Sequence, residues 1–192
     1  DTVVAGSGPT TIFAAGANDL VFGGSGTMLF IAVAGSSTVV AGSGNTVLFG
    51  LNGASATLFG NGNDLLVAGP GNVTLNAGGS TGNNSLFGNQ GADSLVGGSG
   101  TTSFVAGFSG STTMLGGSGV NAFDFVKGAA GGADVIQNWT AKDQVFLLGY
   151  APGGLVSQTI TPGGDAATLS DGTLITFQGL NTTIPGSHFT TT

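Results

Sequence analysis

The side chains that could do chemistry in this chain are its nine aspartates. The 192 residues contain two lysines, a single histidine (His188), no cysteine, and neither arginine nor glutamate. A zinc centre or a serine or cysteine triad cannot be assembled from one histidine and no thiols. Two carboxylates could meet for acid–base catalysis only by accidental proximity, so we expect no enzyme activity. What the aspartates can do therefore depends on the elements that position them.

Those elements are short units that recur about every nine residues from the N-terminus to about Asp124. Each unit consists of a glycine-rich turn and a three-residue strand with one large apolar residue at its centre. The fourteen central residues are Val3, Ile12, Val21, Phe30, Val39, Leu48, Leu58, Leu66, Leu75, Leu86, Leu95, Phe104, Met114 and Phe123. One such strand cannot bury its central residue alone, so the units must stack. The 39 glycines fit the positive φ values that consecutive tight turns require.

The clearest copy of the unit is Phe59–Val67, which reads FGNGNDLLV. It resembles the RTX nonapeptide, GGxGxDxUx, of haemolysin-type calcium-binding proteins, in which U is the large apolar residue. The resemblance implies a parallel β-roll, where two units form one coil and the U residues of alternate units point inward from two facing sheets. Fourteen units would form about seven coils, and a strand spacing of roughly 4.8 Å would make the roll about 34 Å long.

The resemblance also implies a role for the sixth place of the unit, where the family has an aspartate that binds Ca²⁺ together with turn carbonyls. Oxygen ligands of this kind suit a hard cation. Four of the fourteen units carry aspartate there, namely Asp1, Asp19, Asp64 and Asp93. Ligands of one site would come from units two apart, a condition that Asp1 and Asp19 meet and that Asp64 and Asp93 do not. We therefore expect calcium at a few sites at most, with most sites degenerate.

A second interpretation of these aspartates needs no cation. Aspartate commonly hydrogen-bonds to the backbone of its own turn. Threonine, serine and asparagine occupy the sixth place in other units, where they could form stacked ladders that satisfy the polar groups of the turns. The sequence leaves both interpretations open.

The residue after each U residue is apolar in twelve of the fourteen units. Because side chains alternate along a strand, this residue should point away from the core. We expect apolar stripes on both outer surfaces, and such patches mark contact surfaces. The predicted self-association residues are Phe13, Phe49, Phe87 and Val105 on one sheet and Phe22, Phe59 and Val96 on the other. The alternative is a shifted frame that places some of these side chains inside a thicker core.

The pattern changes after Asp124, where the chain resembles the C-terminal segment of serralysin-type and other RTX exoproteins. The resemblance rests on Asp134–Trp139 (DVIQNW) and on Lys142–Leu147 (KDQVFL). It implies that Asp134 and Asp143 are further calcium ligands, although Asn138 and Phe146 stand where the family usually has aspartate. We expect Trp139, Val145 and Leu147 to cap the open end of the core.

The last stretch of the chain contains a hairpin signal. Two alternating strands between Asp165 and Leu180 flank Asp171-Gly172, and an Asp-Gly pair between such strands favours a tight hairpin. The hairpin resembles the tail of type I secretion substrates, and residues 184–189 resemble their terminal signal. His188 falls in what we expect to be a disordered end.

Together these features predict an all-β fold, a parallel β-roll of the RTX-like β-solenoid type with a C-terminal cap and β-hairpin. We expect the roll of degenerate repeats to cover residues 1–125. The cap, the hairpin and the type I secretion signal region should cover residues 126–192.

Charge and hydropathy exclude two classes of function, nucleic-acid binding and membrane spanning. Only 6% of the residues are charged and the net charge is −7, so the basic clusters that nucleic-acid binding needs are absent. No apolar run reaches the length of a membrane span. Asp1 lies inside a repeat and no signal peptide is visible, so we expect a processed product or a fragment of a protein that is secreted, extracellular or on the surface of a bacterium.

Three functions remain open. The first is an extracellular structural repeat protein that associates with itself into a filament, matrix or surface layer. The second is a calcium-linked folding and secretion module of a larger exported enzyme or adhesin. The third is an ice- or surface-binding roll that uses rows of threonine.

Overall fold

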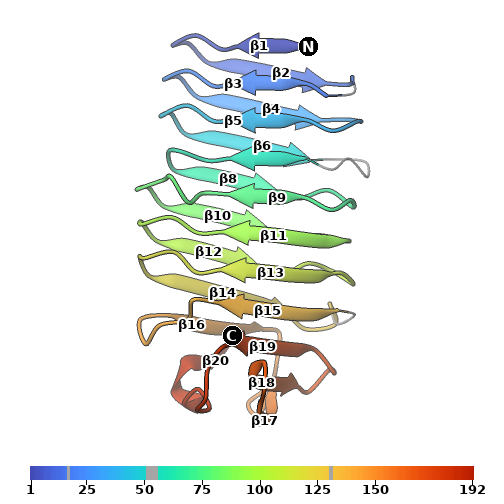
Figure 1. Cartoon of the computed structure of the whole chain (residues 1–192), viewed down its shortest axis with the longest axis vertical. Helices are drawn as coiled ribbons and strands as arrows, with labels where there is room; N and C mark the ends of the chain where they lie inside the picture. The colour runs from blue at the N-terminus through green and yellow to red at the C-terminus, as the bar shows by residue number, and fades with distance from the viewer. Residues whose placement is uncertain (17, 51–55, 130–131) are drawn as a thin grey trace.

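Two facing sheets build the molecule, and the computed structural model describes residues 1–16, 18–50, 56–129 and 132–192. Successive strands alternate between the sheets, so each pair of strands completes one coil (Figure 1). In order of hydrogen-bonded neighbours, sheet A contains β1 (Thr2–Val4), β3 (Leu20–Phe22), β5 (Thr38–Val40), β7 (Thr57–Phe59), β9 (Thr74–Asn76), β11 (Ala92–Val96), β13 (Ser111–Leu115), β15 (Ala133–Gln137), β19 (Leu174–Gln178), β18 (Gly164–Leu169) and β17 (Leu155–Thr161). In the same order, sheet B contains β2 (Thr10–Ala14), β4 (Met28–Ala32), β6 (Thr46–Gly50), β8 (Asp64–Val67), β10 (Asn84–Phe87), β12 (Thr102–Val105), β14 (Asn121–Val126), β16 (Gln144–Leu148) and β20 (Phe189–Thr191).

The strands of the roll pair in parallel and in register from coil to coil. Val3 lies opposite Val21, and Leu48 lies opposite Leu66, so every U residue stacks on the U residue of the coil before it. Within a strand such as β4 the side chains alternate between buried and half-buried. The predicted all-β parallel roll is confirmed, and the helical part of the described residues is one 3₁₀ turn, Gly186–His188.

The U residues form the core between the two sheets. Twelve of the fourteen are completely buried, from Val21 to Phe123. The expectation that every U residue points into a closed core fails for the first coil, because no described coil covers it on the N-terminal side. Val3 there is 36% exposed, and Ile12 is only partly buried.

The turns of neighbouring coils stack so closely that they exclude side chains. A Cβ atom on Gly42 would overlap the carbonyl oxygen of Gly24, and one on Gly24 would overlap that of Gly6. Glycine is required at these places by the approach of the next coil.

The stacking continues beyond residue 125, where the sequence pattern changes. β15 and β16 extend sheets A and B in parallel, and β19 and β20 pair in parallel with them. The predicted hairpin is present, because β18 and β19 pair antiparallel around Gly172, whose φ is +94°. The lower end of the roll in Figure 1 is closed by this hairpin and by the C-terminal strand.

An aromatic cluster closes the end of the core. The Trp139 ring lies 5.9 Å from Phe123, and it contacts Phe177 and His188 edge-on at 5.2 and 5.6 Å. The expectation of a disordered end at His188 is therefore wrong. Its Nδ1 lies 2.9 Å from the Asp143 carbonyl oxygen, and the strand that follows it pairs with β16. Among the described residues, no helix has the length and apolar character needed to cross a membrane.

The burial of the U residues predicts their contribution to stability. We expect Leu95→Ala to lower the free energy of unfolding by about 2–5 kcal/mol, because it opens a cavity between close-packed coils. Leu174→Ala, the same substitution at a residue that is 49% exposed, should cost less than about 1 kcal/mol. Urea denaturation of both variants compares them. Equal losses would contradict the assignment of Leu95 to the core.

Candidate functional site

From Asp19 onward the sixth-place aspartates line the inside of the turns, whereas Asp1 at the open first coil is exposed. In sheet A this row includes Asp19, Asp93 and Asp134, and in sheet B it includes Asp64 and Asp143. All five are buried, with exposed fractions of 8% or less. The row positions each side chain between its own turn and the strand start of the coil before it.

Asp64 and Asp93 each join two coils through backbone amides. Oδ1 of Asp64 accepts the Thr46 N–H of the preceding coil at 2.9 Å, and Oδ2 accepts the Gly62 N–H of its own turn at 2.9 Å. Asp93 likewise accepts the N–H groups of Val73 at 2.9 Å and Asn89 at 2.8 Å. The arrangement satisfies amides that would otherwise be buried without a partner.

Beyond the regular repeats, Asp143 repeats this geometry, and Asp134 repeats its contact with the preceding coil. Oδ1 of Asp134 accepts the Thr112 N–H at 2.8 Å. Asp143 accepts the N–H groups of Asn121 at 2.9 Å and Thr140 at 2.8 Å. The two aspartates singled out for their resemblance to an exoprotein segment therefore hold the last coils by hydrogen bonds.

Two neutral side chains at the sixth place accept a backbone amide of their own turn, as some of the aspartates do. The Thr112 hydroxyl accepts the Gly107 N–H at 3.0 Å, and the Asn121 carboxamide oxygen accepts the Gly117 N–H at 3.1 Å. The Asn121 amide also donates to Oδ1 of Asp143 at 2.9 Å. This is the hydroxyl and amide ladder that the sequence indicated as an alternative to cation binding.

Burial raises the pKa values of Asp64, Asp93 and Asp134. It raises the pKa of Asp134 to about 6, against hydrogen bonds from Thr112 that lower it. Burial also raises the pKa values of Asp64 and Asp93, and hydrogen bonds from backbone amides oppose the rise. Burial therefore makes the ionised form of these three carboxyls less favourable than it is in water.

The donor set of the turns fits a column of calcium ions poorly. Asp64 lies in the sheet B row and Asp93 in the sheet A row, so they do not share a site, as their spacing predicted. Asp1 and Asp19 are in adjacent coils, and the terminal amine of Asp1 lies 3.1 Å from Oδ1 of Asp19. Within the described ranges, no group of three or more acidic or histidine side chains comes together. Neighbours such as Thr112 bring no second carboxylate.

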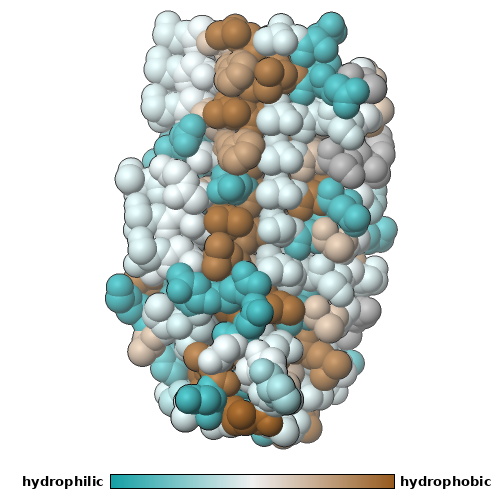
Figure 2. All heavy atoms as spheres, in the orientation of Figure 1, coloured by the Kyte–Doolittle hydropathy of each residue, from teal (hydrophilic) through white to brown (hydrophobic). Residues whose placement is uncertain are grey.

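The outer face of sheet A carries the first predicted apolar stripe. Strand register aligns Val4, Phe22, Val40, Phe59, Asn76, Val96 and Leu115 in one row. Figure 2 shows this row as a mostly brown column along the roll, with a paler column beside it. Phe22 is 40% exposed, and Phe59 and Val96 are half-buried by their neighbours in the row.

The outer face of sheet B carries two apolar rows. The row after the U residues contains the predicted Phe13, Phe49, Phe87 and Val105, of which Phe13 is 66% exposed and Val105 is buried at 9%. The second row was missed from the sequence. It consists of Leu29, Val47 and Leu65, which precede the U residue in every second unit, and that alternation was the available signal.

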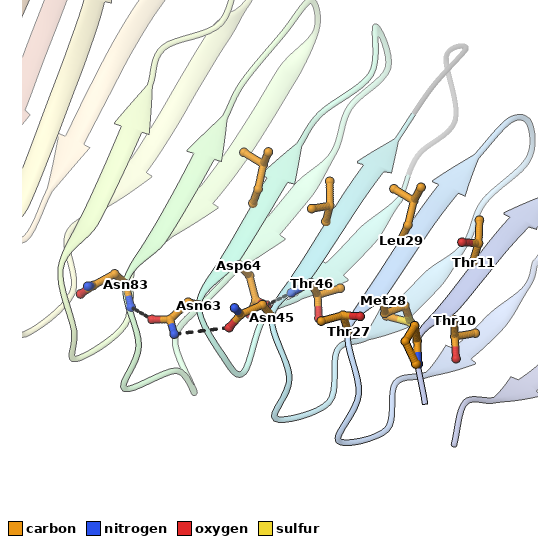
Figure 3. A pocket seen from close by; sticks show the side chains of 13 residues that line it. Thr10, Thr11, Thr27, Met28, Leu29, Asn45, Thr46, Asn63, Asp64 and Asn83 are labelled. Carbon is orange, nitrogen blue, oxygen red and sulfur yellow. Dashed lines mark hydrogen bonds between the residues drawn. The ribbon is translucent and has the colours of Figure 1, made fainter. Parts of the chain in front are cut away.

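A shallow groove of 540 Å³ runs along this second row. Its other side is a ladder of exposed asparagines. The Asn63 amide contacts Oδ1 of Asn45 at 3.4 Å, and the Asn83 N–H donates to Oδ1 of Asn63 at 2.8 Å. Figure 3 shows Asn45, Asn63 and Asn83 along one side of the groove and Leu29 on the other side.

The raised pKa of Asp134 predicts a pH dependence. A carboxyl whose pKa rises on folding, here from 3.8 to about 6, stabilises the fold fully below the lower value. That contribution is lost as the pH rises through the higher value. We predict that the free energy of unfolding in chelator increases as the pH falls from about 8 to about 5, and that Asp134→Asn reduces this increase. Urea titrations at several pH values measure it.

Asp171→Asn is the control for this experiment. At Asp171 burial raises the pKa, but hydrogen bonds led by the Tyr150 hydroxyl outweigh it and lower the pKa to about 2. This carboxyl does not titrate in the tested range, so the variant should keep the slope of the wild type. A wild-type stability that increases with pH would contradict the assignment.

Comparison with known proteins agrees with this geometry. Four copies of the RTX calcium-binding nonapeptide repeat match residues 1–27, 60–81 and 79–103. No curated protein matches the chain significantly. The matches end before Asp124, so the resemblance of the C-terminal segment to serralysin-type exoproteins stays a prediction. The matched residues lie in stacked parallel coils, which fits an RTX β-roll.

Proposed function

We propose that this chain is a secreted structural repeat protein whose rolls associate side by side through the outer face of sheet B. The repeat match supports a secreted repeat protein or module. The observation that carries the structural role is the pair of apolar rows on sheet B. The proposed role is mechanical, and none of its steps is catalytic.

The chemistry of the face favours a second apolar surface as its partner. Outward residues of β2 to β12 are apolar or hydroxyl-bearing, and the first charge in the row after the U residues is Asp124. Burying one phenylalanine fully is worth roughly 1.5–3 kcal/mol, so several half-exposed rings and aliphatic chains in line provide a driving force.

The size of the face sets the strength of the contact. Seven strands from β2 to β14, spaced by about 4.8 Å and about 16 Å long, form a face of roughly 550 Å². Two molecules would bury about 1,100 Å², just below the range of about 1,200–2,000 Å² for specific interfaces. A single contact should therefore be weak and reversible, and association should strengthen when copies stack on more than one face.

Electrostatic repulsion does little to oppose this contact. Six of the nine aspartates are buried in the turns or the cap, namely Asp19, Asp64, Asp93, Asp134, Asp143 and Asp165. The burial of acidic groups leaves the outer faces almost without charge, although the chain as a whole carries −7. Surfaces of ordinary soluble domains carry many more charges.

Charged residues in the apolar row of sheet B should weaken the association between copies. We predict that Phe49→Asp with Phe87→Asp lowers the mean mass in solution, measured by light scattering at tens of micromolar, while circular dichroism stays unchanged. The row tolerates a carboxylate, since Asp124 already sits in it and accepts the Ser103 hydroxyl at 2.9 Å.

The matched control adds the same two charges to exposed turns. Ser43→Asp with Ser99→Asp changes the net charge equally but leaves the outer face of sheet B intact. It should associate like the wild type. A wild type that is monomeric at these concentrations, or a control that dissociates as fully as the face variant, would refute the proposal.

The repeat match favours a second function, a calcium-linked folding module of a larger exported protein. The two functions differ in what calcium does. Most sixth places hold no carboxylate, and the carboxylates of Asp64 and Asp93 already accept backbone amides. We therefore predict a β-type far-ultraviolet circular dichroism spectrum in excess chelator. A disordered spectrum that becomes β-type only on addition of calcium would favour the module.

A further inference from the structure

The longest strand of the molecule is an open edge. β17 spans seven residues, Leu155–Thr161, and it is the last strand of sheet A, where β18 is its one pairing partner among the described strands. Five of its residues are exposed, with Val156 at 63% and Ile160 at 43%. The backbone groups on its free side have the geometry to accept another strand.

Little in β17 protects this edge. Natural edge strands are commonly blunted by lysine, proline, inward charge or a bulge. β17 contains neither charge nor proline, and its one irregularity is a register shift between Leu155 and Ser157 in the pairing with β18. Residues 157–161 beyond that shift form a regular, uncharged strand segment.

The two faces of this segment differ. Gln158 and Ile160 lie opposite the buried Ala167 and Asp165, so they point to the inner face of the sheet. Ser157, Thr159 and Thr161 alternate with them and are exposed on the outer face. The outer face of the edge is thus a row of three hydroxyl-bearing side chains with Thr159 at its centre.

We propose that β17 pairs antiparallel with β17 of a second copy about a two-fold axis at Thr159, which joins two A sheets edge to edge. In this register Thr159 faces its own copy and Ser157 faces Thr161, so every outer pair matches a hydroxyl with a hydroxyl. Each inner pair places Gln158 against Ile160. The strand is complementary to itself and carries no charge that a different partner would recognise, so the occupant is a second copy.

This contact goes beyond the proposed function because it uses the edge of sheet A instead of the outer face of sheet B. An isologous contact of this kind closes on itself as a dimer. Combined with lateral contacts, it would link rolls tail to tail. The two contacts can be tested separately because no residue is shared between them.

Cysteine cross-linking tests the register directly, since the chain has no cysteine of its own. Across an antiparallel pair, two copies of Thr159→Cys would have their Cβ atoms about 4.5–5.5 Å apart, close enough for a disulfide after small adjustment. We expect disulfide-linked dimer under mild oxidation with Thr159→Cys and little with Thr182→Cys, an exposed site away from the edge.

Pairs of charged substitutions then test whether the cross-link forms in this register or in random collisions between molecules. With Thr159→Cys, adding Ser157→Lys and Thr161→Lys places like charges opposite each other and should abolish the cross-link. Adding Ser157→Lys and Thr161→Asp places opposite charges together and should retain it. Equal cross-linking of Thr159→Cys and Thr182→Cys, or of the two charged variants, would overturn the proposal.

The same cross-link in the Phe49→Asp, Phe87→Asp background distinguishes the two contacts. It should persist there even if lateral association is lost. Loss of the cross-link from that background alone would show that the edges meet only inside the lateral assembly, which would also overturn an independent β17 dimer.

Discussion

The structure depends on one constraint, which is that every turn must find its hydrogen-bond partners in the neighbouring coils. Strands of three to six residues leave many polar groups in the turns, and these groups lie against the next coil instead of water. The sixth-place side chains meet this need. An aspartate such as Asp64 accepts one amide from the coil before it and one from its own turn. Glycine is then required where the turns touch, because any Cβ would separate the coils.

The outer surface follows from the same constraint. Most acidic side chains are buried in the turns. The outer faces of the roll therefore present mainly threonine, serine, valine and phenylalanine, in rows of one residue per coil (Figure 2). Such rows share the period of the coil, and a second roll presents the same period. The rows of two copies would therefore match in spacing along the proposed lateral contact.

Much of the fold could be predicted from the sequence, because a nine-residue period with one large apolar residue leaves few alternatives. The core from Val21 to Phe123, the opposite parity of Phe49 and Phe59, and the Asp-Gly hairpin all follow from local pattern. The continuation of the roll past Asp124 was harder to see. Ile136 and Val145 are core residues of the same kind, but the longer turns before them break the period.

The candidate site was less predictable for a physical reason. An aspartate that binds a cation and one that accepts two backbone amides occupy the same place in the unit, and only the coil above reveals which partner is present. The ordered C-terminal tail depends on contacts with residues far away in the sequence, such as that between His188 and the Asp143 carbonyl oxygen. The local sequence around residue 188 does not predict these contacts.

Residue-resolved amide hydrogen exchange in excess chelator tests the central claim, that side chains of adjacent coils hold the turns together. The amides of Thr46, Val73, Thr112 and Asn121 donate to an aspartate of the following coil. We expect slow exchange at these four amides without calcium, and faster exchange at Thr46 in Asp64→Ala. Rapid exchange at all four in chelator, with protection only after calcium is added, would contradict it.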